Sequence, residues 1–193
     1  MLSLTHLDQN VRQAVPEDCT AIARVHVDSW KTAYRGIVPE DYLARLSYTD
    51  REATWSQAIG NPQNIVLVAG DTKTTGNTVI GFVSGGANRT KDTIYAGELY
   101  AIYILKEYRG KGIGRNLVLS LVQRFVDCNI NSMFVWVLTK NPYAKFYDKL
   151  GGQQVGSQQI RIGGTSFEEI AYGWKDLSLL LEMQQKLGDH VEK

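Results

Sequence analysis

Three glycines at alternate positions, with basic residues between and beside them, mark the segment best suited to bind a phosphate. Residues 107–116 read EYRGKGIGRN. Glycine lets the backbone pass close to an anion, and the amides at the start of a helix donate hydrogen bonds to it. Nearby basic side chains add favourable charge. The residues that we expect to contact a phosphate are Arg109, Gly110, Lys111, Gly112, Ile113, Gly114 and Arg115.

Two widespread phosphate-binding motifs do not match this segment. The Walker motif fails because no Gly-Lys pair here is followed by Ser or Thr. The dinucleotide motif Gly-x-Gly-x-x-Gly fails because its third glycine would fall at Arg115 or Leu117. What remains is a strand, the sequence Arg-x-x-Gly-x-Gly and a helix. By itself this pattern also fits a tight turn whose glycines serve only the backbone conformation.

A second motif follows, and the two together resemble one family. Residues 141–152 read NPYAKFYDKLGG. The pair of motifs resembles the GCN5-related N-acetyltransferase family, which carries [Gln/Arg]-x-x-Gly-x-[Gly/Ala] after a strand and Asn-x-x-Ala-x-x-Phe-Tyr-x-x-x-Gly further on. Both occur here in the family's order, with a predicted strand between them. The matching residues of the second motif are Asn141, Ala144, Phe146, Tyr147 and Gly151.

The resemblance implies that acetyl-CoA is the acyl donor. Its diphosphate would lie on the amides of the glycine turn. Its pantetheine arm would lie along the preceding strand, at Ile102, Tyr103 and Ile104, and use main-chain groups. The resemblance gives Asn141 a cofactor contact, although an Asn before Pro142 also suits a purely structural cap.

Two residues are candidates for proton transfer. The resemblance places Tyr147 near the CoA sulfur, where a phenol with an ordinary pKa near 10 can protonate the leaving thiolate. A packed aromatic side chain is the alternative. Glu98 lies eleven residues before Arg109, where some family members carry a glutamate base. Strand alternation predicts that it shares a face with Tyr100 and Ile102. It is a base, a substrate anchor or a salt-bridged glutamate.

The acceptor is expected on the side formed by the first two helices, as the resemblance implies. Asp28, Trp30 and Tyr34 could bind an amine through charge and cation–π contact. Aromatic residues at helical spacing also suit a core. The resemblance implies that the acceptor is a small-molecule or peptide amine. Polyamine, aminoglycoside, amino acid, peptide N-terminus and protein lysine all stay open, as does a longer acyl group.

No residues are arranged for a covalent or metal-dependent mechanism. The three histidines, at positions 6, 26 and 190, are scattered, and no metal-ligand cluster is present in the sequence. Direct transfer from the thioester to an amine is therefore the simplest mechanism. The alternative function is a non-catalytic acyl-CoA-binding sensor or interaction module with the same fold.

The composition excludes several other classes of protein. The formal net charge is +1, which does not favour nucleic-acid binding. No segment has the roughly 18 consecutive apolar residues of a membrane span. The N-terminal sequence lacks the features of a signal peptide, and the two cysteines form no C-x-x-C pair. We expect a cytoplasmic protein.

The pattern of elements predicts one mixed α+β domain over residues 1–193, with a core at 11–175 and a C-terminal helix and tail at 176–193. The resemblance implies a central sheet that is twisted, mostly antiparallel, splayed at the cofactor site and flanked by helices. The leucine-rich final helix could support a homodimer or pack on its own sheet. Strands are predicted at 11–15, 64–70, 78–87, 93–105, 132–139, 153–162 and 165–174, and helices at 16–34, 39–47, 49–59, 112–128, 141–152 and from 176.

Overall fold

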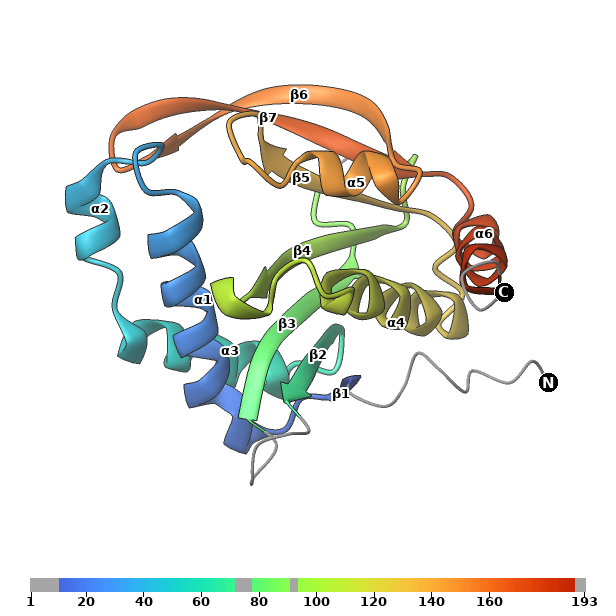
Figure 1. Cartoon of the computed structure of the whole chain (residues 1–193), viewed down its shortest axis with the longest axis horizontal. Coiled ribbons are helices and arrows are strands. Elements are labelled where there is room, and N and C mark those ends of the chain that lie inside the picture. The colour runs from blue at the N-terminus through green and yellow to red at the C-terminus, as the bar shows by residue number, and fades with distance from the viewer. Residues whose placement is uncertain (1–10, 72–77, 91–93, 190–193) are drawn as a thin grey trace.

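The computed structural model describes residues 11–71, 78–90 and 94–189. They form a mixed α/β fold around a seven-stranded sheet of order β1-β2-β3-β4-β5-β7-β6 (Figure 1). Only β4 and β5 are parallel, so the predicted fold class is confirmed. The strands are β1 (Val11–Gln13), β2 (Asn64–Asp71), β3 (Thr78–Ala87), β4 (Gly97–Ile104), β5 (Met133–Leu138), β6 (Gln153–Ile162) and β7 (Thr165–Trp174). The helices are α1 (Cys19–Ala33), α2 (Glu40–Ala44), α3 (Tyr48–Gly60), α4 (Ile113–Asp127), α5 (Lys145–Lys149) and α6 (Leu177–Asp189), with 3₁₀ turns η1 (Pro16–Asp18) and η2 (Lys106–Tyr108).

Two helices are shorter than the sequence predicts, for local reasons. Helix α2 ends early because Ser47 begins the next helix: its hydroxyl accepts a hydrogen bond from the Asp50 amide at 3.1 Å. Helix α5 begins late because the side chain of Asn141 forms a turn first, accepting a hydrogen bond from the Tyr143 amide at 2.9 Å. Side-chain turns of this kind compete with helix formation.

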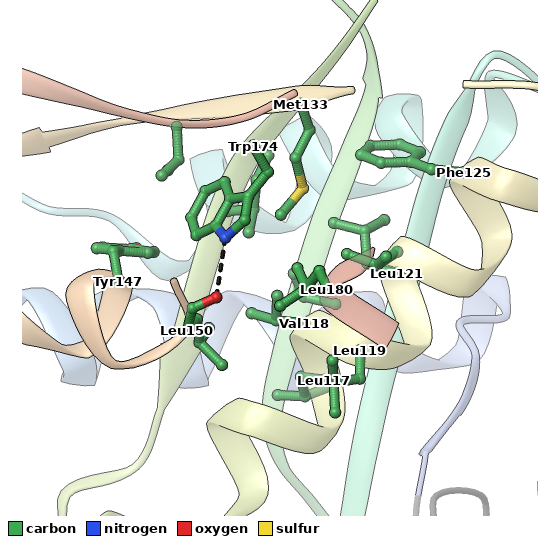
Figure 2. Packing of buried hydrophobic residues seen from close by; sticks show 14 of the residues in the cluster. Leu117, Val118, Leu119, Leu121, Phe125, Met133, Tyr147, Leu150, Trp174 and Leu180 are labelled. Carbon is green, nitrogen blue, oxygen red and sulfur yellow. Dashed lines mark hydrogen bonds between the residues drawn. The ribbon is translucent and has the colours of Figure 1, made fainter. Parts of the chain in front are cut away.

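The larger part of the core lies between α4 and one face of the sheet (Figure 2). Leu117, Leu121 and Phe125 on α4 are fully buried there. The fit requires glycine at Gly85 on β3, because a Cβ at that position would lie 2.8 Å from the Phe125 ring. On the same face the Trp174 indole donates to the Leu150 carbonyl at 3.0 Å. Helix α4 is therefore held firmly against the middle of the sheet.

Helices α1 and α3 cover the opposite face. Ile22 and Val25 of α1 and Trp55 of α3 pack there against Val68 and Phe82 of the sheet. Trp55 meets the Phe82 ring edge-on, with 4.7 Å between ring centroids. The middle of the sheet is thus enclosed from both sides, which fixes α1 relative to the strands.

The sheet opens between β4 and β5. These strands pair only at Gly97–Met133 and Glu98–Phe134, and then diverge (Figure 1). Beyond the paired positions, residues 100–104 of β4 are only partly buried although the strand is central. The register with β3 shifts here, and Tyr100 is the extra residue of a β-bulge. The predicted splay of the sheet is therefore present.

The bulge corrects one expectation from strand alternation. The sequence predicts that Glu98, Tyr100 and Ile102 share a face, as they would in a regular strand. Instead, Ile102 packs in the same cluster as Leu99, on the side of α4. The extra residue at Tyr100 reverses the alternation, so Ile102 lies on the face opposite Glu98.

The C-terminal helix α6 packs on the chain's own core. Leu177 and Leu180 are buried in the cluster around α4, whereas Leu179 and Met183 are more than half exposed. In the described part of the chain, no helix is long and apolar enough to cross a membrane.

The packing of α4 gives a direct test of this core. Leu121→Ala should lower the free energy of unfolding by about 3–5 kcal/mol, because it leaves a cavity beside Phe125 and Gly85. Leu179→Ala is the matched control, since the same truncation on the exposed side of α6 should change stability by less than about 0.5 kcal/mol. Urea denaturation of both variants measures the difference. Equal losses would contradict the described packing.

Candidate functional site

The glycine turn lies at the end of β4 and forms the start of α4. Gly110 and Gly112 both have left-handed backbone conformations, with φ angles of +76° and +83°. Gly112 precedes the first residue of α4, and no side chain caps the helix. Uncapped amides at a helix start attract anions through hydrogen bonds and through the helix dipole. The donor set therefore fits the diphosphate of CoA.

Arg109 connects three parts of the protein across the opening. Its Nε donates to the carbonyl of Ile104 at 2.8 Å, and its two terminal nitrogens reach the hydroxyls of Tyr143 at 2.9 Å and Thr32 at 3.2 Å. The guanidinium thus joins α1, the end of β4 and the turn before α5. Since these hydrogen bonds use N–H groups of the guanidinium, the side chain of Arg109 links the three segments and fixes the conformation of the glycine turn.

Along β4, the side chains of the residues predicted to bind pantetheine point alternately to the two faces of the sheet. Ile102 and Ile104 contact the cluster around α4, whereas Tyr103 contacts the clusters formed with α1. The Ile104 carbonyl accepts hydrogen bonds from Arg109 and also from Ser29, the latter at 3.2 Å. The end of β4 is therefore held by side chains, and the stretch nearer the bulge is better placed to offer main-chain groups to a ligand.

Tyr147 has a buried ring and no hydrogen-bond partner in the described residues. The ring lies 5.5 Å from that of Tyr172, in a stacked arrangement, and meets Phe146 edge-on at 5.2 Å. Burial raises the pKa of Tyr147 well above its usual value, and the nearby phenols of Tyr103 and Tyr172 raise it further. The hydroxyl is therefore protonated at neutral pH and has a proton to donate.

Two more tyrosine hydroxyls lie near that of Tyr147. Tyr103 accepts a hydrogen bond from the Trp30 indole at 2.8 Å, and Tyr34 accepts one from the Asn141 amide at 3.1 Å. Burial is the main cause that raises both pKa values, and electrostatic coupling to Tyr147 links the three groups. Each phenol that accepts in this way still has its own proton to donate. Residues predicted separately for catalysis, cofactor and substrate thus form one cluster.

The side chain of Asn141 is used within the protein. Its Nδ2 donates to Tyr34, and its Oδ1 accepts from the Tyr143 amide. Asn141 therefore has a structural role, which was one of the two roles that the sequence left open. Its predicted contact with the cofactor stays a prediction.

Asp28 lies apart from the tyrosine cluster. Its carboxylate accepts a hydrogen bond from Tyr48 at 2.7 Å. It lines an open cavity of about 680 Å³ whose other walls include Arg24 and Glu52. Of the three predicted acceptor residues, Trp30 and Tyr34 are together in the cluster, and Asp28 lines this cavity instead.

Glu98 is buried and paired with an arginine. Its two oxygens accept hydrogen bonds from the Arg89 side chain at 2.5 and 3.1 Å, and one also accepts from the Arg89 amide. The same guanidinium lies 3.8 Å over the ring of Tyr100. The salt-bridged arrangement that the sequence left as an alternative is thus the one in the structure. Proton transfer to Glu98 would weaken these bonds.

The imidazole of His26 packs against the ring of Tyr103. The two rings stack with 4.8 Å between centroids, and the Trp55 indole donates to His26 Nδ1 at 3.2 Å. Burial, with a smaller effect from Arg51, lowers the pKa of His26 to about 3, so the imidazole is neutral at physiological pH. No group of three residues in the described chain is arranged to hold a metal ion.

Sequence reasoning missed one residue, Glu169 on β7. Burial raises the pKa of its carboxyl group, and its charge acts on the phenols of both Tyr34 and Tyr103. The sequence signal is the pair Glu168–Glu169 between Phe167 and Ile170 in a predicted strand, where alternation directs one of the two side chains inward.

Comparisons with known proteins show the family of the chain. Residues 25–152 match the family model described as Acetyltransferase (GNAT) family. The chain is 41% identical over 171 residues to the N-acetyltransferase YuaI of Bacillus subtilis, covering 88% of this chain and 95% of that protein. It is 25% identical to the L-amino acid N-acyltransferase MnaT of Escherichia coli, covering 95% and 96%. The structure of a PaiA N-acetyltransferase from Thermoplasma acidophilum in complex with coenzyme A superposes with a TM-score of 0.62 at 24% identity, covering 85% and 98%.

The glycine turn gives a test of cofactor binding. Gly112→Ala should weaken CoA binding about tenfold or more, because a Cβ is strained at φ +83° and redirects the helix-start amides. Gly36→Ala is the control: Gly36 has φ +71°, and like Gly112 it has open space around it. Both variants should lose about 1–2 kcal/mol of stability. Titration calorimetry with CoA measures the affinities. An equal effect of both variants on CoA binding would rule out this role of the turn.

Proposed function

The chain belongs to the acetyltransferase (GNAT) family and uses acetyl-CoA as acyl donor, and we propose that it transfers the acetyl group directly to the primary amine of a small molecule. One observation supports this most strongly. The uncapped start of α4 follows β4, which borders the opening, and Tyr103 of β4 belongs with Tyr34 and Tyr147 to a cluster of three protonated tyrosine hydroxyls. The strand beside the opening is therefore close both to a site suited to an anion and to groups that can donate a proton.

In this proposal the amides of the turn from Arg109 to Arg115 hold the diphosphate, and main-chain groups of β4 near Ile102 hold the pantetheine arm. Acetyl-CoA supplies an activated acyl group. Tyr147 gives its phenolic proton to the departing sulfur, since its buried hydroxyl is protonated and bonded to no described group.

A small acceptor is favoured by what is known of two relatives. MnaT is named for L-amino acids. A second relative, from Salmonella typhimurium, is 25% identical and is named for L-methionine sulfoximine and L-methionine sulfone. Both named substrates carry a primary amine on an amino acid. Amino acids and their derivatives are therefore the first acceptors to examine.

An amine panel with acetyl-CoA tests the proposed function. Free thiol release, with mass spectrometry of the product, should identify at least one amino acid, amino acid amide, diamine or dipeptide that is acetylated on nitrogen. Tight CoA binding with no thiol release for any amine would instead favour a non-catalytic acyl-CoA-binding module.

The role of Tyr147 can be separated from its packing. Tyr147→Phe should lower kcat about 100-fold and leave CoA affinity nearly unchanged, because only the proton donor is lost. Tyr172→Phe is the control, since it removes a hydroxyl from the ring stacked on Tyr147 and should affect stability more than kcat. Steady-state kinetics and CoA titration measure both. An unchanged kcat in Tyr147→Phe would refute the proton-donor role.

The role of Glu98 can be tested by comparing its substitution with that of its ion-pair partner, Arg89. If Glu98 acts as a base, Glu98→Gln should lower kcat/KM far more than Arg89→Gln does, with the greatest loss at low pH. If Glu98 serves the structure through Arg89, the two variants should be similar and the double variant no worse than either, because paired residues are not additive. Kinetics of the three variants decides between these roles.

A further inference from the structure

Three buried or partly buried carboxylates, Asp18 of η1, Glu98 of β4 and Glu169 of β7, differ in their partners. Asp18 is paired with Arg12, with 2.6 Å between an oxygen and a guanidinium nitrogen. Glu98 is paired with Arg89. No cation in the described residues pairs with Glu169, although that side chain is partly buried. Burying an unpaired carboxylate is unfavourable, so such a group is a candidate for a functional site.

The position of Glu169 is set by the register of the sheet. On β7 it lies opposite Leu138 of β5, and it shares a face with Phe167, two residues earlier. Leu138 and Phe167 are both buried in the cluster that contains Tyr34. Glu169 therefore belongs to the face of the sheet that α1 and α2 cover, on the β5 side of the opening.

The groups around Glu169 are neutral. Its one printed hydrogen bond comes from the Gln158 amide of β6 at 3.2 Å. From α1 and β4 its charge acts on the phenols of Tyr34 and Tyr103, which pack in the same cluster as Leu138. From β5 its cross-strand neighbour is the apolar Leu138. A single negative charge beside aromatic rings is the arrangement that recognises an ammonium ion.

We propose that Glu169 is the residue that binds the acceptor amine in its ammonium form and accepts its proton, with the rings of Tyr34 and Tyr103 beside it. The ammonium nitrogen loses one proton to a carboxylate oxygen of Glu169. The charged pair then becomes a neutral amine and a neutral carboxylic acid. Partial burial favours this exchange because it disfavours both charged forms. The inference rests on the proposed function, and it names the acceptor as a cationic primary amine.

The first test measures binding without turnover. Calorimetry on enzyme saturated with CoA uses L-methioninamide and putrescine as cationic probes and N-acetyl-L-methioninamide as the uncharged analogue of the first. Wild-type enzyme should prefer the cationic probe. Glu169→Gln should weaken its binding about tenfold or more, because a charge-assisted contact is lost. Wild-type enzyme that does not prefer a cationic probe, or equal binding by both proteins, would overturn the proposal.

Glu168→Gln is the matched control. It removes the same charge from the neighbouring, exposed position, whose side chain is directed to the opposite face of β7. It should change probe binding less than twofold. An effect as large as that of Glu169→Gln would show that net charge, and not the position of Glu169, decides binding.

The pH dependence distinguishes binding from general structural damage. In wild-type enzyme, probe binding should weaken as the pH falls through the raised pKa of Glu169, because protonation removes the negative charge. In Glu169→Gln this dependence should be absent, and its persistence would overturn the proposal. Charge-dependent binding without thiol release would contradict the proposed transfer reaction and leave the role of Glu169 in binding supported.

Discussion

In the described chain, β4 and β5 pair as strands at only two positions, Gly97–Met133 and Glu98–Phe134. Beyond them the strands diverge, and β4 leaves main-chain groups beside an opening in the middle of the protein. Backbone amides and carbonyls away from water require partners. A sheet that separates at its centre is therefore stable only where side chains, solvent or a ligand supply those partners, and the placement of the site follows from this requirement.

The opening is maintained by packing on both faces. Helix α4 is fixed on one side through Leu121 and Phe125, and α1 on the other through Ile22 and Val25. Three hydrogen bonds of Arg109 join the end of β4 to α1 and to the turn before α5. Because packing and hydrogen bonds hold these elements against the sheet, the start of α4 and the tyrosine cluster are positioned before a ligand binds. A preorganised site of this kind loses little energy to reorganisation when a ligand binds.

The electrostatics of the site depend on which ionisable groups are kept neutral. Burial keeps Tyr34, Tyr103 and Tyr147 protonated and His26 uncharged, while Glu98 is compensated by Arg89. Charge near the acceptor side is therefore concentrated in few groups, which makes the position of each one important. A neutral, aromatic surrounding strengthens every remaining charge interaction, since the local dielectric response is weak.

The sequence by itself determined the family, the fold class and the glycine turn, because each follows from motifs and patterns of residues close together in the chain. A left-handed glycine before a helix and the alternation of a strand are local properties. The bulge at Tyr100, the pairing of Glu98 with Arg89 and the position of Glu169 were decided only by the tertiary structure. They depend on register and on which segments fold over one another, and neighbouring residues in a sequence carry no information about charges that approach from another strand or helix.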